Sequence, residues 1–179
     1  MIKTKIRKNI IRIRKIKFSQ NHNINIKYLI SVIKKNNLKN FSVGGYYPVN
    51  FEIDDLSILQ ELQRRKIKIS LPVIKKNKDM SFCEWSFNKP LVLNFCGIPE
   101  PLKSKIVIPD IVLVPLVAYD DRNFRIGYGG GYYDRYIEKI TKKKKIFTIG
   151  LAFSFQKINK VPTNKYDKRL NLVITEKNF

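Results

Sequence analysis

Short apolar runs recur along the chain with the length of buried strands. The longest spans residues 106–114, and its near-continuous isoleucines, valines and leucines are typical of a strand buried on both faces of a parallel sheet. Further strands are expected at residues 41–43, 67–74, 147–153 and 172–175. Pro72 lacks a backbone N–H and therefore favours a place for 67–74 toward a sheet edge.

The segments between these runs carry apolar residues at helical spacing. Isoleucines keep one face of residues 2–17, a second helix is expected from Ile26 to near Asn36, a third after a cap at Asp54, and a fourth through Tyr133 and Ile140. Strands that alternate with helices predict an α/β fold. We expect a single domain over residues 1–179, with a largely parallel central sheet flanked by helices in a three-layer, doubly wound arrangement.

The stretch from residue 80 to residue 101 departs from that alternation. Alternating aromatic residues in 80–93 surround the lone tryptophan, Trp85, which favours a hairpin with Trp85 in the core. Residues 97–101 contain Pro99 and Pro101, which predict a loop because prolines so close together prevent regular pairing.

The chain is strongly basic, with a formal net charge of +22. Such a charge, and a basic amphipathic helix at 2–17, would suit nucleic acid or an anionic membrane. The lysines are spread along the whole chain, however, so we expect compositional drift and no specific nucleic-acid partner. The helix is instead expected to pack its isoleucines on the sheet, while Lys3 and Arg7 project together one turn apart.

Few residues are available for nucleophilic or metal chemistry. The single histidine, His22, lies in an Asn-rich turn, which excludes Ser–His and Cys–His mechanisms. Cys83 and Cys96 fit neither a zinc nor a disulfide pattern and are expected to be reduced thiols. No signal peptide and no run of about 18 apolar residues is seen, so we expect a cytoplasmic protein without membrane contact. We also expect a monomer.

A glycine cluster follows the longest apolar run. Residues 127–131 read Gly-Tyr-Gly-Gly-Gly and lead into the helix near Tyr133, which places free backbone N–H groups at a helix N-terminus and predicts a phosphate site. The cluster is neither a dinucleotide fingerprint nor a P-loop, and a plain tight turn is the alternative. Arg125 before it and Asp134 in the first helical turn favour a metal-bound polyphosphate.

Several motifs in this chain occur in the order of a known family. Residues 125–135, Arg-Ile-Gly-Tyr-Gly-Gly-Gly-Tyr-Tyr-Asp-Arg, follow Val-Pro-Leu-Val-Ala-Tyr-Asp at 114–120. Further matching pieces are Lys3 with Arg7, residues 45–48 with Glu52, residues 97–101, and a closing pattern of Val161-Pro162, Asp167 and 173–175. Together they resemble the 5-formyltetrahydrofolate cyclo-ligase family over nearly the whole chain.

The resemblance implies an ATP-dependent enzyme with Mg²⁺ as cofactor that converts 5-formyltetrahydrofolate to 5,10-methenyltetrahydrofolate, releasing ADP and phosphate. ATP would phosphorylate the formyl oxygen, N10 of the folate would attack, and phosphate would leave. Such chemistry requires positioning and charge neutralisation more than a protein nucleophile.

The resemblance also assigns residues to the two substrates. ATP would be bound by Lys3, Arg7, Arg125, Gly127, Gly129, Gly130, Gly131, Tyr132 and Tyr133, with Arg125 as the catalytic cation. The folate would contact Tyr47, Glu52, Tyr128 and Tyr132, and Asp134 and Asp167 would hold Mg²⁺. The Glu52 carboxylate suits the pterin ring because it can accept two N–H donors at once.

Two departures from the family and two rival hypotheses accompany this interpretation. Lys8 and Asn9 follow Arg7, where many relatives have an acidic residue, and Gly130 stands where some relatives carry lysine. The cation that meets the transferred phosphate is thus open, and we choose Arg125. The rivals are a catalytically inactive, basic nucleic-acid-binding module on the same fold, and another phosphate-handling enzyme without folate.

Overall fold

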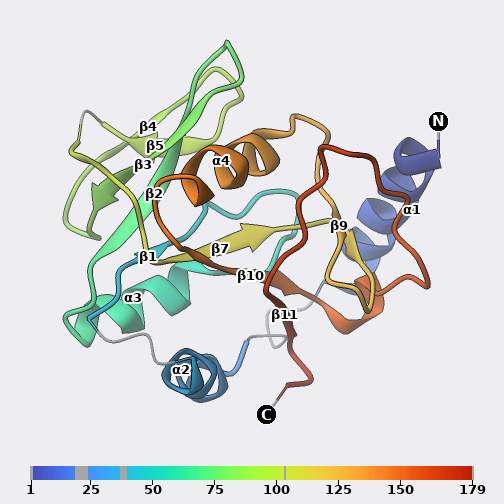
Figure 1. Cartoon of the computed structure of the whole chain (residues 1–179), viewed down its shortest axis with the longest axis horizontal. Coiled ribbons are helices and arrows are strands. Elements are labelled where there is room, and N and C mark those ends of the chain that lie inside the picture. Colours follow the sequence, from blue (N-terminus) through green and yellow to red (C-terminus); the bar gives the residue numbers. More distant parts are fainter. Residues whose placement is uncertain (1, 19–23, 37–39, 103, 179) are drawn as a thin grey trace.

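A seven-stranded sheet runs through the centre of the molecule (Figure 1). The computed structural model describes residues 2–18, 24–36, 40–102 and 104–178, and His22 lies outside them. Within these ranges the strand order is β11-β10-β7-β1-β2-β3-β6. The strands are β1 (Val43–Gly44), β2 (Ile69–Ile74), β3 (Met80–Trp85), β6 (Ile106–Val107), β7 (Ile111–Pro115), β10 (Phe147–Ala152) and β11 (Leu172–Thr175). All neighbours from β11 to β2 pair in parallel, and β3 and β6 add an antiparallel edge.

Helices cover both faces of this sheet, as the sequence predicted. On one face, α2 (Ile26–Lys35) and α3 (Leu56–Arg64) pack against Ile111 and Leu113 of β7. On the other, α4 (Tyr132–Thr141) packs against Val112 and Val114. Because successive residues of a strand point to opposite faces, β7 contributes to both apolar clusters. The three-layer α/β prediction is confirmed.

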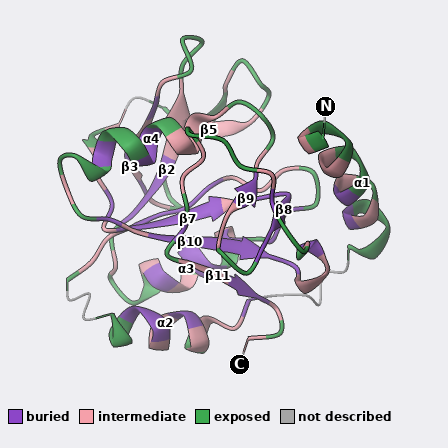
Figure 2. Cartoon of the chain, turned by 45° about the vertical axis from the view of Figure 1, so that its right-hand side comes forward, coloured by how far each residue is buried: buried purple, intermediate pink, exposed green. Residues whose placement is uncertain are grey.

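The first helix, α1 (Ile2–Lys17), packs on a different surface from the one expected. It lies beside a small hairpin of β8 (Ala118–Tyr119) and β9 (Arg125–Ile126), where Ile10 meets Val117, Ala118 and Ile126. Figure 2 shows α1 at the side of the molecule with only its inner face buried. The main sheet is already covered by α2, α3 and α4, and Ile2 and Ile16 at the helix ends are exposed.

The apolar run at 106–114 forms two strands and not one. β6 pairs with β3 at the sheet edge, where Ile106 is exposed, and Pro109 and Asp110 separate it from β7. The edge position expected for residues 67–74 was also wrong, since β2 lies between β1 and β3. Pro72 is tolerated there because β1 is short and pairs only with Ile69 and Ser70.

The prolines at 99 and 101 belong to a strand, contrary to the loop expected there. β5 (Pro99–Pro101) pairs antiparallel with β4 (Leu91–Leu93). Asn94 N–H donates to Ile98 O at 3.0 Å, so by the alternation of an antiparallel ladder both prolines fall at non-hydrogen-bonded positions. β3 pairs with β2 and β6, not with β4, so no 80–93 hairpin forms, but Trp85 does lie in the core.

One short element and the start of α3 remain to be described. A 3₁₀ turn, η1 (Ser154–Gln156), follows β10. At the start of α3, Asp54 Oδ1 accepts from Leu56 N–H at 3.0 Å, as expected of a cap, whereas Asp55 occupies the position next to the helix. The Asp55 side chain turns inward and accepts from Tyr46 N–H at 2.7 Å.

Candidate active site

A cavity of about 920 Å³ opens beyond the carboxyl ends of the parallel strands. Its walls include Tyr46 and Tyr47 after β1, Ile74 at the end of β2, and Pro115 at the end of β7. This is where ligands bind in open α/β sheets. The structure also brings to this cavity every residue that the sequence pointed to, namely Lys3, Arg7, Tyr47, Glu52, Arg125, Gly127, Tyr128, Gly129, Gly130, Gly131, Tyr132, Tyr133, Asp134 and Asp167.

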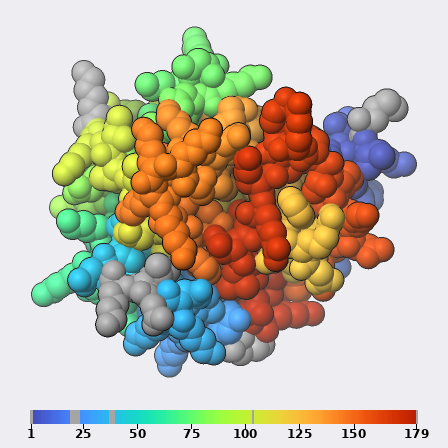
Figure 3. Space-filling model, in the orientation of Figure 1, coloured from blue at the N-terminus to red at the C-terminus, as the bar shows by residue number. Residues whose placement is uncertain are grey.

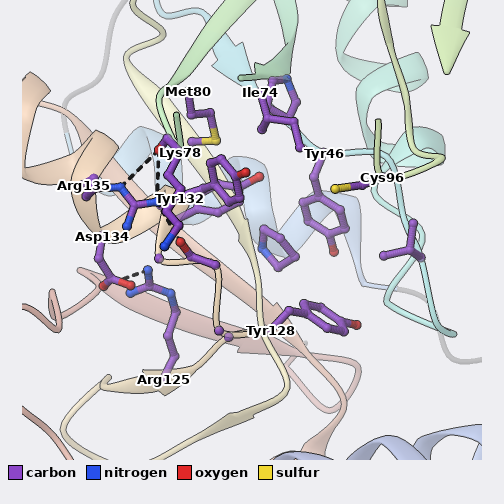
Figure 4. Close-up of a pocket in the computed structure, with 18 of the residues that line it drawn as sticks. Tyr46, Ile74, Lys78, Met80, Cys96, Arg125, Tyr128, Tyr132, Asp134 and Arg135 are labelled. Carbon is purple, nitrogen blue, oxygen red and sulfur yellow. Dashed lines mark hydrogen bonds and ion pairs between the residues drawn. The ribbon is translucent and has the colours of Figure 1, made fainter. Parts of the chain in front are cut away.

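Arg125 and Asp134 form the centre of the charged end of the cavity (Figure 4). The Arg125 side chain is only 4% exposed, and its Nη2 donates to Asp134 Oδ1 at 3.0 Å while its Nη1 donates to Lys168 O at 2.8 Å. Asp134 Oδ1 also accepts from Lys168 N–H at 2.9 Å. The segment around residue 168 therefore lies against α4, as the surface in Figure 3 shows, and fixes the guanidinium from two sides.

The glycine loop presents its backbone to the same cavity. Gly129 has φ +103° and Gly131, which precedes α4, has φ +68°, conformations that side chains rarely adopt. Among the described residues, no acceptor contacts the N–H groups of Gly129, Gly130 or Gly131. Arg7 Nε donates to Gly127 O at 2.8 Å and holds the start of the loop. These unpaired N–H groups at a helix N-terminus suit an anion.

Lys3 and Arg7 both line the cavity, and each binds a different protein partner. Lys3 Nζ pairs with both carboxylate oxygens of Asp167, at 2.6 and 2.8 Å, whereas Arg7 binds the glycine loop. Asp167 Oδ2 also accepts from Asn164 N–H at 2.6 Å, which closes its loop. The two cations thus connect α1 to two different walls of the site.

The buried carboxylate of Asp120 anchors the loop that carries Asp167. It accepts from Val161 N–H at 2.9 Å and forms an ion pair with Arg122, whose Nη2 also donates to Val161 O. Burial alone would raise the pKa of Asp120, but the hydrogen bonds from Val161, Arg122 and Phe124 hold it below its usual value. Asp120, the last residue of the 114–120 motif, is therefore a structural link between β8 and Val161.

Aromatic side chains gather at the opposite end of the cavity, where Figure 4 shows Tyr46 and Tyr128 away from Arg125 and Asp134. Glu52 lies buried among them, and its Oε2 accepts from Val49 N–H at 2.8 Å. Its Oε1 has no hydrogen-bond partner among the described residues. Burial raises the pKa of Glu52 to about 7, against the opposing effects of the Val49 N–H, Arg14 and Tyr128.

Arg14 is a buried cation that the sequence did not reveal as part of the site. It is 1% exposed, its Nη1 donates to Leu116 O at 3.2 Å, and its Nη2 donates to the Tyr128 hydroxyl. Its guanidinium also lies 5.7 Å from the centre of the Tyr128 ring. The helical spacing of Arg7, Ile10 and Arg14 on one face was the available signal, but it was hidden among the many cations of the helix.

Two further walls come from chain segments that sequence reasoning did not assign to the site. The β4–β5 hairpin contributes Asn94, Cys96 and Ile98, the turn between β2 and β3 contributes Lys78, and the start of β3 contributes Met80. Glu100 Oε2 accepts from Asn94 Nδ2 at 3.0 Å and from Ile74 N–H at 3.2 Å, which attaches the hairpin to β2. These walls depend on tertiary packing, so local sequence carries little trace of them.

The cysteines and the other side chains that could bind a metal ion lie as follows. Cys83 is buried and Cys96 is exposed, and both are free thiols, as expected. Over the described residues, no group of three or more His, Cys, Asp or Glu side chains is placed to hold a metal ion. In the same ranges, no helix has the length and apolar character required to cross a membrane.

Comparison with known proteins places this architecture in a family. Residues 2–176 match the model of the 5-formyltetrahydrofolate cyclo-ligase family. The chain is 29% identical over 173 residues to the Haemophilus influenzae 5-formyltetrahydrofolate cyclo-ligase, covering 93% of this chain and 91% of that one. For the Escherichia coli K12 protein of the same name, identity is 31% over 141 residues, or 75% and 77% of the two chains.

Solved structures agree with this result. The NMR structure of Aquifex aeolicus 5,10-methenyltetrahydrofolate synthetase is similar with a TM-score of 0.78 and 29% identity, covering 99% of this chain and 91% of that one. The Mycoplasma pneumoniae 5,10-methenyltetrahydrofolate synthetase, at 24% identity and a TM-score of 0.70 over 99% and 100% of the two chains, shares the fold. With a family match over almost its full length, this chain belongs to the 5-formyltetrahydrofolate cyclo-ligase family.

Proposed function

We propose that this protein uses ATP to convert 5-formyltetrahydrofolate to 5,10-methenyltetrahydrofolate in the cavity beyond β1, β2 and β7. One observation carries the proposal. In a member of the cyclo-ligase family, a glycine loop with unpaired backbone N–H groups lies at one end of a cavity, and at the other end lies a buried carboxylate with one oxygen unpaired among the described residues. A reaction between a nucleotide and a ring substrate requires that arrangement, because the two reacting groups must meet.

The nucleotide is assigned to the charged end. The free N–H groups of Gly129, Gly130 and Gly131 would bind phosphate oxygens, and Lys3, Arg7 and Arg125 would neutralise their charge. We retain the assignment of Arg125 as the cation nearest the transferred phosphate. Its contacts to Asp134 and Lys168 O fix its orientation before any ligand binds, so little reorganisation is required.

The folate ring is assigned to the aromatic end. Glu52 Oε1 is a buried acceptor without a partner among the described residues, and it belongs to a side chain that lines the cavity. The amino and amide N–H groups of a pterin would supply its missing donors. Tyr47 and Tyr128 would form walls for the ring, and Tyr132 lies between the two ends on the first turn of α4. Burial raises the pKa of Tyr128, so its hydroxyl stays neutral and available for hydrogen bonding.

Mg²⁺ is assigned to Asp134 and Asp167. Both carboxylates line the cavity, and Asp134 Oδ2 has no protein donor among the described residues. Oxygen donors from one or two carboxylates, completed by phosphate and water, fit the usual magnesium site in phosphoryl transfer. When bound, the ion would neutralise charge on the phosphates. Asp167 now faces Lys3, so Lys3 would share the carboxylate or shift toward the nucleotide.

The reaction then needs no protein nucleophile. The formyl oxygen attacks the γ-phosphorus, the bond to ADP breaks, and the formyl carbon becomes electrophilic. N10 of the same folate attacks that carbon and loses its proton, and the C–O bond breaks to release phosphate and leave the methenyl ring. The protein contributes alignment and charge stabilisation, for which the fixed Arg125 and the preformed loop are suited.

The family match and the intact Arg125, Asp134 and Asp167 favour this enzyme over the basic nucleic-acid-binding module. We infer that the +22 charge is compositional. The proposal includes a cytoplasmic location, which the two free thiols support. Nucleic-acid retention that weakens steeply with salt and is unaffected by site mutations would instead support the module.

The test is an ultraviolet absorbance assay for the methenyl product with purified protein, 5-formyltetrahydrofolate, ATP and Mg²⁺. Arg125→Ala and Asp134→Ala are compared with two surface controls, Arg12→Ala on α1 and Asp121→Ala after β8. We expect ATP-dependent product formation that both site variants abolish and both controls retain. Absence of product from a folded protein that binds ATP would refute the proposed function.

A further inference from the structure

The turn between β2 and β3 is held in one fixed position. Its backbone closes through Lys78 N–H to Lys75 O at 2.9 Å and Lys75 N–H to Asp79 O at 3.0 Å, with Lys78 at φ +66°. From α4, the Arg135 guanidinium donates two hydrogen bonds to Lys78 O, at 3.1 Å from Nε and 3.0 Å from Nη2. A planar guanidinium that binds one oxygen through two nitrogens restricts orientation as well as distance.

The same guanidinium also binds the glycine loop. Arg135 Nη2 donates to Gly130 O at 2.7 Å, so one side chain joins the β2–β3 turn to the loop. Lys139 pairs with Asp79 at 3.2 Å and adds a second attachment to α4. Figure 4 shows Arg135, Lys78 and Tyr132 side by side, and in Figure 3 the tip of the turn lies on the surface next to α4.

This attachment places the side chain of Lys78, from the turn between β2 and β3, in the wall of the cavity. Among the described residues that line the cavity, the cations are Lys3, Arg7, Lys78, Arg125 and Arg135. Four of them bind protein acceptors: Lys3 binds Asp167, Arg7 binds Gly127 O, Arg125 binds Asp134, and Arg135 binds Lys78 O. Within the same described residues, the Lys78 ammonium group has no hydrogen bond or ion pair.

An unpaired ammonium group beside a glycine loop is suited to bind an anion. Gly130 brings no side chain of its own, so any cation that meets a phosphate at this point of the loop comes from a neighbouring segment. We propose that Lys78 contacts a phosphate oxygen of the nucleotide and that Arg135 is a positioning residue that holds Lys78 against the loop. This inference rests on the proposed function only in placing the nucleotide at the glycine loop.

Lys76 offers a matched control, because it lies in the same turn and is exposed but does not line the cavity. We expect Lys78→Ala to weaken binding of Mg-ATP, measured by calorimetric titration without folate, by about tenfold, the loss expected for one hydrogen bond to a charged group. Lys76→Ala should bind ATP as the unmodified protein does. In turnover assays Lys78→Ala should raise KM for ATP and leave KM for 5-formyltetrahydrofolate unchanged.

Arg135 is tested by coupling. Arg135→Ala should weaken ATP binding in the unmodified protein and have little further effect in the Lys78→Ala background, a non-additivity that a purely structural role would not give. Equal ATP affinity for Lys78→Ala and Lys76→Ala would overturn the proposal. A change confined to KM for a folate with a longer glutamate tail would also overturn it, by assigning Lys78 to carboxylates. Because the titration measures ATP binding without turnover, its outcome is separate from failure of the ligase assay.

Discussion

The Glu52→Gln substitution should remove a pH dependence of folding stability. Glu52 is buried, one of its carboxylate oxygens has no hydrogen-bond partner in the part of the chain that the structure describes, and burial raises its pKa from 4.5 to about 7. Between these values the native chain retains a proton that the unfolded chain has lost, so stability falls as pH rises through this window. Each pH unit corresponds to about 1.4 kcal/mol, which gives a total cost of about 3 kcal/mol above pH 7. Glutamine does not titrate and escapes this cost.

The assay is urea unfolding of both proteins at about pH 5 and about pH 8. We expect the stability of Glu52→Gln relative to the unmodified protein to increase by about 2.5 kcal/mol between the two conditions, because part of the total cost is already present at pH 5, where the unfolded carboxyl is mostly ionised. A lost or gained hydrogen bond at residue 52 is the same at both pH values and drops out of that change. Asp55, whose pKa is raised by burial and also by the charge of Glu52, is present in both proteins, and loss of the Glu52 charge changes stability in the same direction. Glu61→Gln on α3, where Glu61 pairs with Arg65 at 2.9 Å, is the matched control substitution.

The same reasoning predicts proton release when the folate binds. A ring that donates N–H groups to Glu52 favours the ionised carboxylate, so binding at about pH 6 should release a proton. Calorimetric titration in buffers of different ionisation enthalpy would measure it. A stability difference between Glu52→Gln and the unmodified protein that does not vary with pH would refute the argument from burial.

Two other substitutions test the two ends of the cavity. Gly129→Ala places a side chain at φ +103° and should weaken ATP binding by about tenfold or more through backbone strain. The control is Gly97→Ala, which is also at positive φ but lies in the β4–β5 turn with open space around it. It should leave ATP binding unchanged in the same titration. Arg14→Met leaves Tyr128 and Glu52 without their buried cation. It should raise KM for 5-formyltetrahydrofolate and lower the free energy of unfolding in urea by about 3 kcal/mol. Arg12→Met on the exposed face of α1 should change neither quantity.

The features of the site that are local in sequence were predictable from sequence. Arg125, the glycine loop and Asp134 are contiguous, and a loop that enters a helix has only a few geometries. The alternation of Ile111 and Val112 between two apolar clusters likewise follows from strand period.

Features that depend on tertiary packing were missed. In the sequence, Arg14 looks like the other cations of α1, and only the packing of α1 on the β8–β9 hairpin distinguishes it. In the sequence, Lys78 is one of several lysines in a turn. What distinguishes it is the hydrogen bond that its carbonyl accepts from Arg135, which lies far along the chain. The loop expected at 97–101 followed from composition, yet the alternation of hydrogen-bonded pairs leaves room for both prolines. Residue type alone does not give the partner on which each of these roles depends.

The central claim is that one cavity couples ATP cleavage to closure of the folate ring. The most direct measurement is the ratio of ADP to methenyl product, with both quantified in the same reaction, together with ADP release in the absence of folate. The account predicts one ADP for each methenyl group, and no ADP release without 5-formyltetrahydrofolate. ADP release that proceeds equally without the folate, or methenyl formation that does not require ATP, would contradict it.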